Sequence, residues 1–334
     1  MEQKNLKNTV LITGGCGFIG HHFVEHFLKN TKWNIVVLDK LTYASGGFDR
    51  VRDIKAFDDK RVLFLTTDLT RPISEGILQE VKNIDYILHL AAETHVDKSI
   101  ADPEPFVMSN IVGTLHILNL AKEISNLKAF VLFSTDEVFG PAPLNVAYKE
   151  WDRYNSTNPY SATKAGSEEL TLSFMNTYSL PGFITHCMNV FGERQHPEKF
   201  IPLCVRKIVH GEGVIIHSDS TKTKSGSRFY IHARNVANAI YFLLDKFEQR
   251  EKYNIVGEKE VTNLKLAQMI AKILDKELKY TLVDFHSSRP GHDLRYALDG
   301  TKMEKLGWKV PLTFEESLEH TVKWIVDRNF WGDI

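Results

Sequence analysis

Two residues four positions apart carry the types needed for coupled proton and hydride chemistry. Tyr160 and Lys164 stand in the run NPYSATK, where Pro159 is well suited to begin a helix. This spacing places both side chains on one helix face, and an ammonium group beside a phenol favours the phenolate. The pair could remove the proton of a hydroxyl while a hydride leaves the same carbon. YxxxK alone also fits a packed tyrosine beside a solvated lysine.

A hydroxyl and two acids stand ahead of this pair, in the run STDEVFG at Ser134–Gly140. Open α/β sheets bind ligands at the carboxyl ends of their strands, so Thr135 could share a hydrogen-bond path with Tyr160. Asp136 and Glu137 could act as an acid and a base if their surroundings separated their pKa values. An ordinary polar loop is the alternative for the two acids.

A glycine-rich turn joins the first apolar run to an amphipathic helix. Gly14, Gly17 and Gly20 are spaced as GxxGxxG, and such a turn lets a pyrophosphate approach the helix N-terminus. A glycine turn without a ligand is the alternative. Asp39 ends the next apolar run, where a carboxylate could bind an adenosine ribose and would repel a 2′-phosphate. NAD is therefore favoured over NADP, although Lys40 follows directly and weakens that preference.

These segments need a scaffold, and the hydrophobic pattern predicts one. Short apolar runs without polar alternation, as expected of strands buried on both faces, alternate with helix-like segments. The runs are Thr9–Thr13, Asn34–Asp39, Val62–Thr66, Tyr86–Leu90, Phe130–Ser134 and Phe183–Asn189. The helices are expected at about 18–30, 74–82, 104–125 and 159–179. Right-handed crossovers then give an α/β fold, a Rossmann-type doubly wound parallel sheet.

The pattern loosens after about residue 190 and predicts a second, smaller lobe. We expect an NAD-binding Rossmann domain over 1–190 and a mixed nucleotide-sugar-binding lobe over 191–334, with some exchange of chain between them. Helices are expected near 199–210, 232–247, 263–275 and 314–328, and strands at Val214–His217 and Arg228–Ile231. The polar run at 217–227 is interpreted as a surface loop.

Composition excludes several classes of protein. The 334 residues carry 41 basic and 42 acidic side chains, for a net charge of −1, which argues against a nucleic-acid partner. Cys16, Cys187 and Cys204 lack metal-ligand spacing, so neither a metal site nor a disulfide framework is expected. No signal peptide is evident, and no run approaches the roughly 20 apolar residues of a membrane span. A soluble, cytoplasmic protein without a membrane partner is expected.

Seven motifs occur in a fixed order and resemble those of one family. They are TGGxGFIG, LDKLTYA around Asp39, AAETHVDKSI (91–100), STDEVFG (134–140), NPYSATKAG (158–166), PEKFIP (197–202) and RPGHDLRYALD (289–299). Over about residues 8–328 the chain resembles the nucleotide-diphosphoglucose 4,6-dehydratases of the extended short-chain dehydrogenase/reductase family. These include the bacterial dTDP-glucose enzymes and the UDP-glucose enzymes of rhamnose synthesis. Related 4-epimerases and decarboxylases, the alternative functions, do not usually combine STDE with YxxxK.

The resemblance implies a reaction as well as a fold. Tyr160, beside Lys164, would take the 4-hydroxyl proton while hydride passes from C4 to a tightly bound NAD, and Thr135 would hydrogen-bond the same oxygen. Glu137 would remove the C5 proton, and a protonated Asp136 would assist departure of the 6-hydroxyl as water. Hydride return to C6 and reprotonation at C5 would complete the 4-keto-6-deoxy sugar and regenerate NAD. A non-catalytic NAD-binding sensor, the more remote alternative, would not need these five side chains together.

The resemblance also implies contacts at the edge of the site. Besides the glycine turn, Asp39, Lys40, Tyr160 and Lys164, cofactor contacts are expected from Phe18, Ile19, Thr42, Asp68, Leu69, Leu90, Ala91, Ala92, Thr94, Asn110 and Ser134. Besides Thr135, contacts with the nucleotide-diphosphate sugar are expected from Thr94, His95, Asn189, Lys199, His217, Arg228, Asn263, Arg289 and His292. The two arginines are favoured because a guanidinium forks onto phosphate oxygens. Asp68 could equally cap a helix, and Asn110 could equally be a buried structural residue.

Some positions depart from the family pattern. Phe139 and Phe191 stand where relatives usually have tyrosine, and the segment Ser218–Ser227 is longer than the usual turn. His217 matches several UDP-glucose enzymes and gives a slight preference for UDP-glucose. The resemblance further implies a homodimer that pairs the helices at about 104–125 and 159–179. Ile111, Leu115 and Leu118 are apolar enough for that interface but could equally face the sheet.

Overall fold

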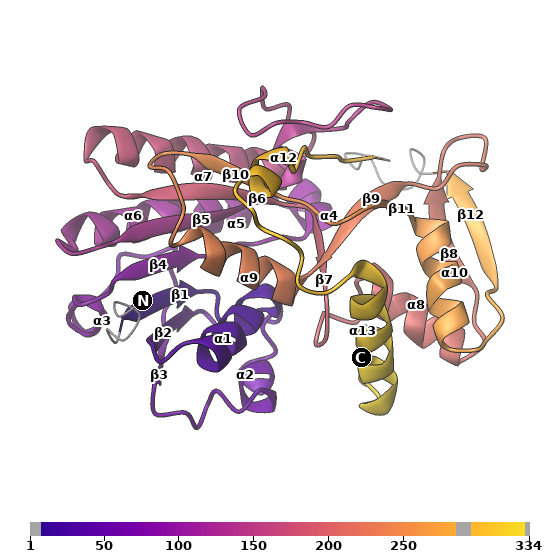
Figure 1. Cartoon of the computed structure of the whole chain (residues 1–334), viewed down its shortest axis with the longest axis horizontal. Coiled ribbons are helices and arrows are strands. Elements are labelled where there is room, and N and C mark those ends of the chain that lie inside the picture. Colours follow the sequence, from indigo (N-terminus) through magenta and orange to yellow (C-terminus); the bar gives the residue numbers. More distant parts are fainter. Residues whose placement is uncertain (1–7, 285–294, 331–334) are drawn as a thin grey trace. The chain divides into compact units, whose positions relative to one another are not determined.

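The computed structural model describes residues 8–284 and 295–330, and these residues form two compact units (Figure 1). The first unit comprises the described residues up to Val138, together with Asn158–His186 and Ile240–Tyr253. The second comprises Phe139–Thr157, Cys187–Ala239 and the described residues from Asn254 onward. Each unit is therefore assembled from segments that are separated along the chain.

A seven-stranded sheet forms the centre of the first unit. Its strands are β1 (Thr9–Thr13), β2 (Asn34–Asp39), β3 (Val62–Thr66), β4 (Tyr86–His89), β5 (Ala129–Thr135), β6 (Gly182–Cys187) and β10 (Lys252–Ile255). They lie in the order β10-β6-β5-β4-β1-β2-β3. The pairs β1–β2, β2–β3, β1–β4 and β4–β5 are parallel. The chain runs from β1 outward to β3 and then returns to β4, so the switch point of a Rossmann-type fold lies between β1 and β4. The predicted fold class is confirmed.

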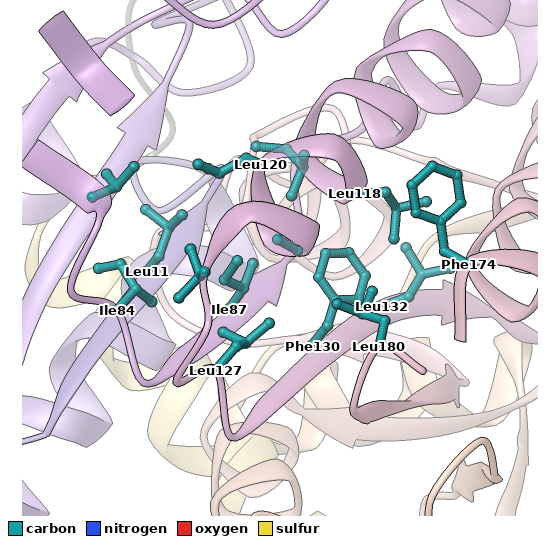
Figure 2. Close-up of a cluster of buried hydrophobic side chains, with 14 of the residues drawn as sticks. Leu11, Ile84, Ile87, Leu118, Leu120, Leu127, Phe130, Leu132, Phe174 and Leu180 are labelled. Atoms are coloured by element: carbon teal, nitrogen blue, oxygen red, sulfur yellow. The ribbon is translucent and has the colours of Figure 1, made fainter. Parts of the chain in front are cut away.

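Helices cover this sheet because its strands carry apolar residues toward both faces. The helices are α1 (Phe18–Asn30), α2 (Asp49–Asp53), α3 (Glu75–Val81), α4 (Val96–Ala101), α6 (Gly113–Glu123) and α7 (Pro159–Thr177). On one face, Leu118 of α6 and Phe174 of α7 join Phe130 and Leu132 of β5 in a core cluster (Figure 2). Elsewhere in the unit, Phe27 of α1 packs against Tyr241 of α9 (Ala233–Leu243) at a ring-centroid distance of 5.6 Å.

The helix expected at 104–125 contains a π-helical turn. It begins as α5 (Glu104–Phe106), widens into the π-helix η2 (Val107–Val112) and continues as α6. In the widened turn, the carbonyl of Asn110 accepts hydrogen bonds from the Thr114 hydroxyl at 2.5 Å and the Ser167 hydroxyl at 2.6 Å. This carbonyl thus accepts one hydroxyl from its own helix and one from α7. Turns of this kind are frequent at functional sites.

The start of α7 confirms the helix predicted from Pro159. Asn158 is the N-cap, and its side chain accepts the backbone N–H of Ser161 at 2.9 Å. The Ser161 hydroxyl in turn bonds the backbone N–H of Asn158 at 3.3 Å, which completes a capping box. The cap fixes the first turn of α7, which carries Tyr160.

The second unit has two small sheets and its own core. Strands β7 (Asn189–Phe191), β9 (Ser227–His232) and β11 (Glu260–Thr262) form one sheet in the order β11-β9-β7. Strands β8 (Val214–Ser218) and β12 (Tyr280–Asp284) form a parallel pair. The helices are α8 (Phe200–Val209), α10 (Asn263–Ile273), α12 (Thr301–Lys305) and α13 (Phe314–Asp327). Leu266 and Leu318 are among the side chains fully buried in this core. Between residues 8 and 330, no described helix has the length and apolar character needed to cross a membrane.

Candidate active site

The glycine turn between β1 and α1 is closed by backbone contacts that leave no room for side chains. Gly14 has a φ of +71°, a left-handed conformation that favours glycine. A Cβ atom on Gly20 would lie 2.1 Å from the Gly14 carbonyl oxygen. The N-cap of α1 is Gly17, which offers no side-chain cap. The first N–H groups of α1 are therefore available to an anion such as a pyrophosphate.

Asp39 at the end of β2 is held against this turn. Its carboxylate accepts the backbone N–H groups of Cys16 at 2.9 Å and Leu41 at 2.8 Å. Burial raises its pKa, and these hydrogen bonds act in the opposite direction. A carboxylate oxygen has a second lone pair, so Asp39 can also accept hydrogen bonds from ribose hydroxyls.

Lys40 does not present an isolated positive charge beside Asp39. Its ammonium group lies 2.9 Å from the Asp68 carboxylate. Burial opposes ionisation of Asp68, but hydrogen bonds from Lys40 and Thr70 outweigh it and lower its pKa. Lys40 is thus paired with a carboxylate, and the carboxylates nearby do not favour a 2′-phosphate. The arrangement suits NAD better than NADP.

A buried histidine that we did not predict links β1, the strand before the glycine turn, to the start of α6, directly after the π-helical turn. His89 Nδ1 lies 2.7 Å from the Thr13 hydroxyl, and Nε2 lies 3.0 Å from the Thr114 hydroxyl. Burial, together with the charge of Lys164, lowers the pKa of His89 to about 3. A neutral ring with its proton on Nε2 satisfies each partner, because Thr13 then donates to Nδ1 and Thr114 donates to the Asn110 carbonyl.

The loop after β4, where cofactor contacts are expected, is held by two polar side chains. The Thr13 hydroxyl accepts the N–H groups of Leu90 at 3.2 Å and Ala91 at 3.1 Å. The Asn110 side chain accepts the N–H of Glu93 at 2.8 Å and donates to its carbonyl at 3.0 Å. Asn110 therefore supports the backbone, and a direct cofactor contact stays a prediction for it.

The two predicted chemical segments meet within the first unit. Lys164 Nζ donates to the carbonyl of Phe133 in β5 at 2.8 Å. Asn158 Nδ2, two residues before Tyr160, donates to the Glu137 carboxylate at 3.3 Å. Tyr160 and Lys164 are both buried side chains of α7. Burial lowers the pKa of Lys164 to about 8, although Glu168 acts in the opposite direction.

The acids after β5 lie in unequal surroundings. Thr135 and Asp136 are buried, whereas Glu137 is half-buried. The Thr135 hydroxyl donates to Asp136 at 3.0 Å and accepts the backbone N–H of Glu137 at 3.3 Å. The two carboxylates of this short 3₁₀ turn, η3 (Asp136–Phe139), accept from different side chains, Thr135 for Asp136 and Asn158 for Glu137. Such a pair can divide acid and base roles.

The remaining predicted cofactor residues of the first unit lie on five segments. Phe18 and Ile19 form the first turn of α1, and Thr42 follows β2. Leu69 accepts a hydrogen bond from His116 through its carbonyl at 2.7 Å. Ala92 and Thr94 lie in the loop after β4, and His95, expected to touch substrate, is the N-cap of α4. The Ser134 hydroxyl donates to Glu168, a buried acid that we did not predict.

Only some of the residues of the second unit that we expect to contact the nucleotide lie close together, on or beside β9. On β9, Arg228 has its guanidinium carbon 4.7 Å from the centre of the Tyr296 ring. The hydroxyl of Tyr230, also on β9, donates to Asn263 at 2.8 Å. Asn189 pairs with Tyr230 across the β7–β9 ladder. Elsewhere in this unit, Lys199 precedes α8 and His217 lies on β8, while Arg289 and His292 lie outside the described residues.

The two phenylalanines that replace tyrosine are packed among aromatic rings of the second unit. Phe139 lies 5.6 Å from Tyr148 and 5.4 Å from Tyr154, measured between ring centres. Phe191 lies 5.7 Å from Phe314. Their rings therefore contribute packing at these positions. Among residues 8–284 and 295–330, no group of three or more His, Cys, Asp or Glu side chains could hold a metal ion.

Comparisons with known proteins agree with this geometry. Residues 11–321 match the family described as GDP-mannose 4,6 dehydratase. The chain is 35% identical to dTDP-glucose 4,6-dehydratase 1 of Escherichia coli K12, over 97% of this chain and 94% of that one. The crystal structure of DesIV, a dTDP-glucose 4,6-dehydratase of Streptomyces venezuelae with NAD bound, superposes with a TM-score of 0.86. That match has 34% identity and covers 97% of this chain and 99% of DesIV.

An epimerase shares the fold at lower identity. The UDP-glucose 4-epimerase of Thermus thermophilus, in complex with NAD, has a TM-score of 0.84. It is 25% identical, over 95% of this chain and 99% of the epimerase. The fold alone thus does not separate the two activities, whereas the sequence identity is higher to the two dehydratases, at 35% and 34%. As its motifs predicted, the chain belongs to the nucleotide-sugar 4,6-dehydratase family.

Proposed function

We propose that this chain is an NAD-dependent nucleotide-diphosphoglucose 4,6-dehydratase that forms the 4-keto-6-deoxy sugar. The observation that carries the proposal is the hydrogen bond between Asn158 and Glu137, with 3.3 Å between donor and acceptor. It joins the loop acids to the first turn of α7, which carries Tyr160. An epimerase needs no second acid–base pair for C5 and C6, whereas a dehydratase does.

The residues around the glycine turn fit NAD as the cofactor. The open N-terminus of α1 would hold the pyrophosphate, and Asp39 would bind the adenosine ribose. When bound, NAD supplies reversible hydride uptake. Tyr160 would remove the 4-hydroxyl proton as C4 gives up its hydride, with Lys164 stabilising the phenolate. Thr135 would hydrogen-bond the same sugar oxygen.

The second half of the reaction would use the two acids after β5. A ketone at C4 acidifies the hydrogen at C5, which Glu137 would remove as a proton. Asp136 would give a proton to the 6-hydroxyl, so that the C6–O bond breaks and water leaves. The hydride taken from C4 would then add to C6, and Glu137, whose carboxyl proton exchanges with solvent, would reprotonate C5. Tyr160 would pass the 4-hydroxyl proton to solvent and Asp136 would take one up, so that atoms and electrons balance and both the side chains and the cofactor end as they began.

The proposal extends to the nucleotide of the substrate, the oligomeric state and the cellular location. The names of the curated relatives favour dTDP-glucose, whereas His217 favours UDP-glucose, so both belong in the assay. We also propose a cytoplasmic homodimer, with rhamnose or another deoxysugar as the end product of its pathway. Leu118 is fully buried in the core of the first unit and faces the sheet, which removes it from the predicted dimer interface. Val107, on the same continuous helix, is exposed and fits that interface better.

The variant Glu137→Gln tests the assignment of the C5 base. With dTDP-glucose in deuterium oxide, the wild-type enzyme should place solvent deuterium at C5 of the product. The variant should still bind NAD but lose this exchange, because an amide cannot take the proton. Glu169→Gln, at an exposed position of α7, is the matched control and should behave as wild type. Unchanged turnover in Glu137→Gln would remove Glu137 from the mechanism, and a galactose product alone would overturn the proposed reaction.

A further inference from the structure

A buried carboxylate lies one helical turn beyond Lys164. Glu168 of α7 is fully buried, and three polar side chains surround its carboxylate. The Ser134 hydroxyl donates to one oxygen. His186 Nε2 lies 2.9 Å from the other oxygen, and Lys252 Nζ lies 3.6 Å from it. These partners come from β5, β6 and β10, so the cluster ties α7 to three neighbouring strands.

The cluster shares its attachment to β5 with the proposed catalytic lysine. The carbonyl of Phe133 accepts from Lys164, and the next residue, Ser134, donates to Glu168. Thr135, which would bind the sugar oxygen, follows directly. A displacement of Glu168 would therefore move both the lysine and the strand end that carries Thr135.

A buried group of charges is a costly way to hold a helix on a sheet. Removing carboxylates and ammonium groups from water is unfavourable, and apolar residues of similar volume often hold a core as well or better. Farther along α7, side chains such as Phe174 in Figure 2 pack in the apolar core that also contains Phe130 and Leu132 of β5. The position of this cluster beside the lysine suggests a role beyond packing.

The charges of the cluster act on Lys164. Burial lowers the pKa of Lys164, and the charge of Glu168 raises it. Burial opposes ionisation of Glu168, but His186, Lys252 and Ser134 together lower its pKa, so its negative charge persists. Tyr160 lies one turn before Lys164 on α7, and the charge of Lys164 acts on the neutral His89 of β4. The charges of Glu169 and Glu251 act on Lys252.

We propose that Glu168 is a positioning residue that keeps Lys164 protonated and directed toward Tyr160, and that Ser134, His186 and Lys252 hold its carboxylate in place. This inference rests on the proposed function, because it assumes that Lys164 stabilises the phenolate of Tyr160. Glu168 itself touches neither substrate nor cofactor. It acts through the charge of the lysine.

The pH dependence of turnover separates this role from simple packing. Glu168→Gln keeps the shape of the side chain but removes its charge, so Lys164 should lose its proton at lower pH. The alkaline limb of kcat/KM should move to lower pH, with a loss of at least about tenfold at pH 8 that shrinks as the pH falls. Glu80→Gln, at an exposed position of α3 remote from the cluster in sequence, should show the wild-type profile. An equal loss at every pH would overturn the proposal.

A second variant predicts a shift of the opposite sign. Lys252→Met removes a positive charge from the cluster and leaves Glu168 less neutralised, so Lys164 should keep its proton to higher pH. The alkaline limb should therefore move upward. General damage to the contact between α7 and β10 would not reverse the direction of the shift. A downward shift in Lys252→Met would contradict the proposal, even if Glu168→Gln failed to fold.

Direct titration of Lys164 keeps the inference separate from the proposed reaction. In protein grown on isotope-labelled lysine, the Lys164 signal can be assigned by its absence from Lys164→Arg and followed by NMR as the pH changes. We expect its midpoint to fall in Glu168→Gln and to rise in Lys252→Met. These shifts in the midpoint would support the inference even if the enzyme turned over no nucleotide sugar. A lack of turnover would refute only the proposed function. An unchanged midpoint in Glu168→Gln would overturn the inference in an enzyme that remains active.

Discussion

Gly20→Ala tests whether close backbone packing in the glycine turn is required for cofactor binding. The added Cβ would lie 2.1 Å from the Gly14 carbonyl oxygen and 2.7 Å from the Gly15 Cα. Cβ atoms essentially never approach other heavy atoms closer than 3.0 Å, so α1 and the turn must separate by nearly an ångström. Overpacking of this kind costs ~1–3 kcal/mol, against a gain of ~1 kcal/mol from the better helix propensity of alanine. The separation also moves the N–H groups that would hold the pyrophosphate, so NAD affinity should fall at least about tenfold.

Urea unfolding and NAD titration measure the two effects of this substitution. The matched control is Gly76→Ala in α3, because a Cβ at Gly76 meets nothing within 4 Å. The control should bind NAD as the wild type does and be unchanged or stabilised by up to about 1 kcal/mol. If Gly20→Ala bound NAD with wild-type affinity and unfolded at the wild-type urea concentration, the proposed role of the turn would be refuted.

Three further predictions follow from buried contacts of the first unit. The folded-state pKa of His89 is about 3, against an ordinary 6.5, so the unfolded chain takes up the proton first and stability falls as the pH drops from 6.5 toward 3. At pH 5 the free energy of unfolding should be ~2 kcal/mol lower because of this group, and urea unfolding of His89→Gln should not show that decrease. The same pH dependence of stability in His89→Gln and wild type would contradict the prediction. Asn110→Ala leaves the backbone of Glu93 without its partners and should cost ~1–3 kcal/mol, with weaker NAD binding by titration; wild-type values for both would refute its positioning role. Leu118→Ala opens a cavity in the core and should lower the free energy of unfolding by ~2–5 kcal/mol without changing oligomeric state, whereas dissociation of a dimer would place Leu118 at an interface.

The first strands and the first helix of the Rossmann-type sheet could be predicted, because the sequence pattern that marks each of them lies within the element itself. The bounds of β1, α1, β2 and β3 agree with the expected ones, since apolar runs and turn residues mark their ends. The strands β10, β11 and β12 were not predicted. They have only three to five residues, and the pairing that stabilises them is remote in sequence.

The site residues also fall into those that could be found from local sequence and those that depend on remote pairing. The motifs around Tyr160 and Asp136 could be found from residue type and spacing, because the chemistry needs both. His89 could have been suspected as a polar residue in an otherwise apolar strand, and Glu168 from its position four residues after Lys164. What remained inaccessible was their set of partners, since His186 and Lys252 reach Glu168 only through the pairing of β6 and β10 at the edge of the sheet.

The fate of the hydrogen at C4 tests the central claim most directly. The enzyme should be incubated with dTDP-glucose or UDP-glucose deuterated at C4, and the product analysed by mass spectrometry and NMR. If Tyr160, Asp136 and Glu137 act as proposed, the product is lighter than the substrate by one water, the deuterium lies at C6 and C4 is a ketone. A product of unchanged mass that keeps deuterium at C4 would contradict the account and identify an epimerase.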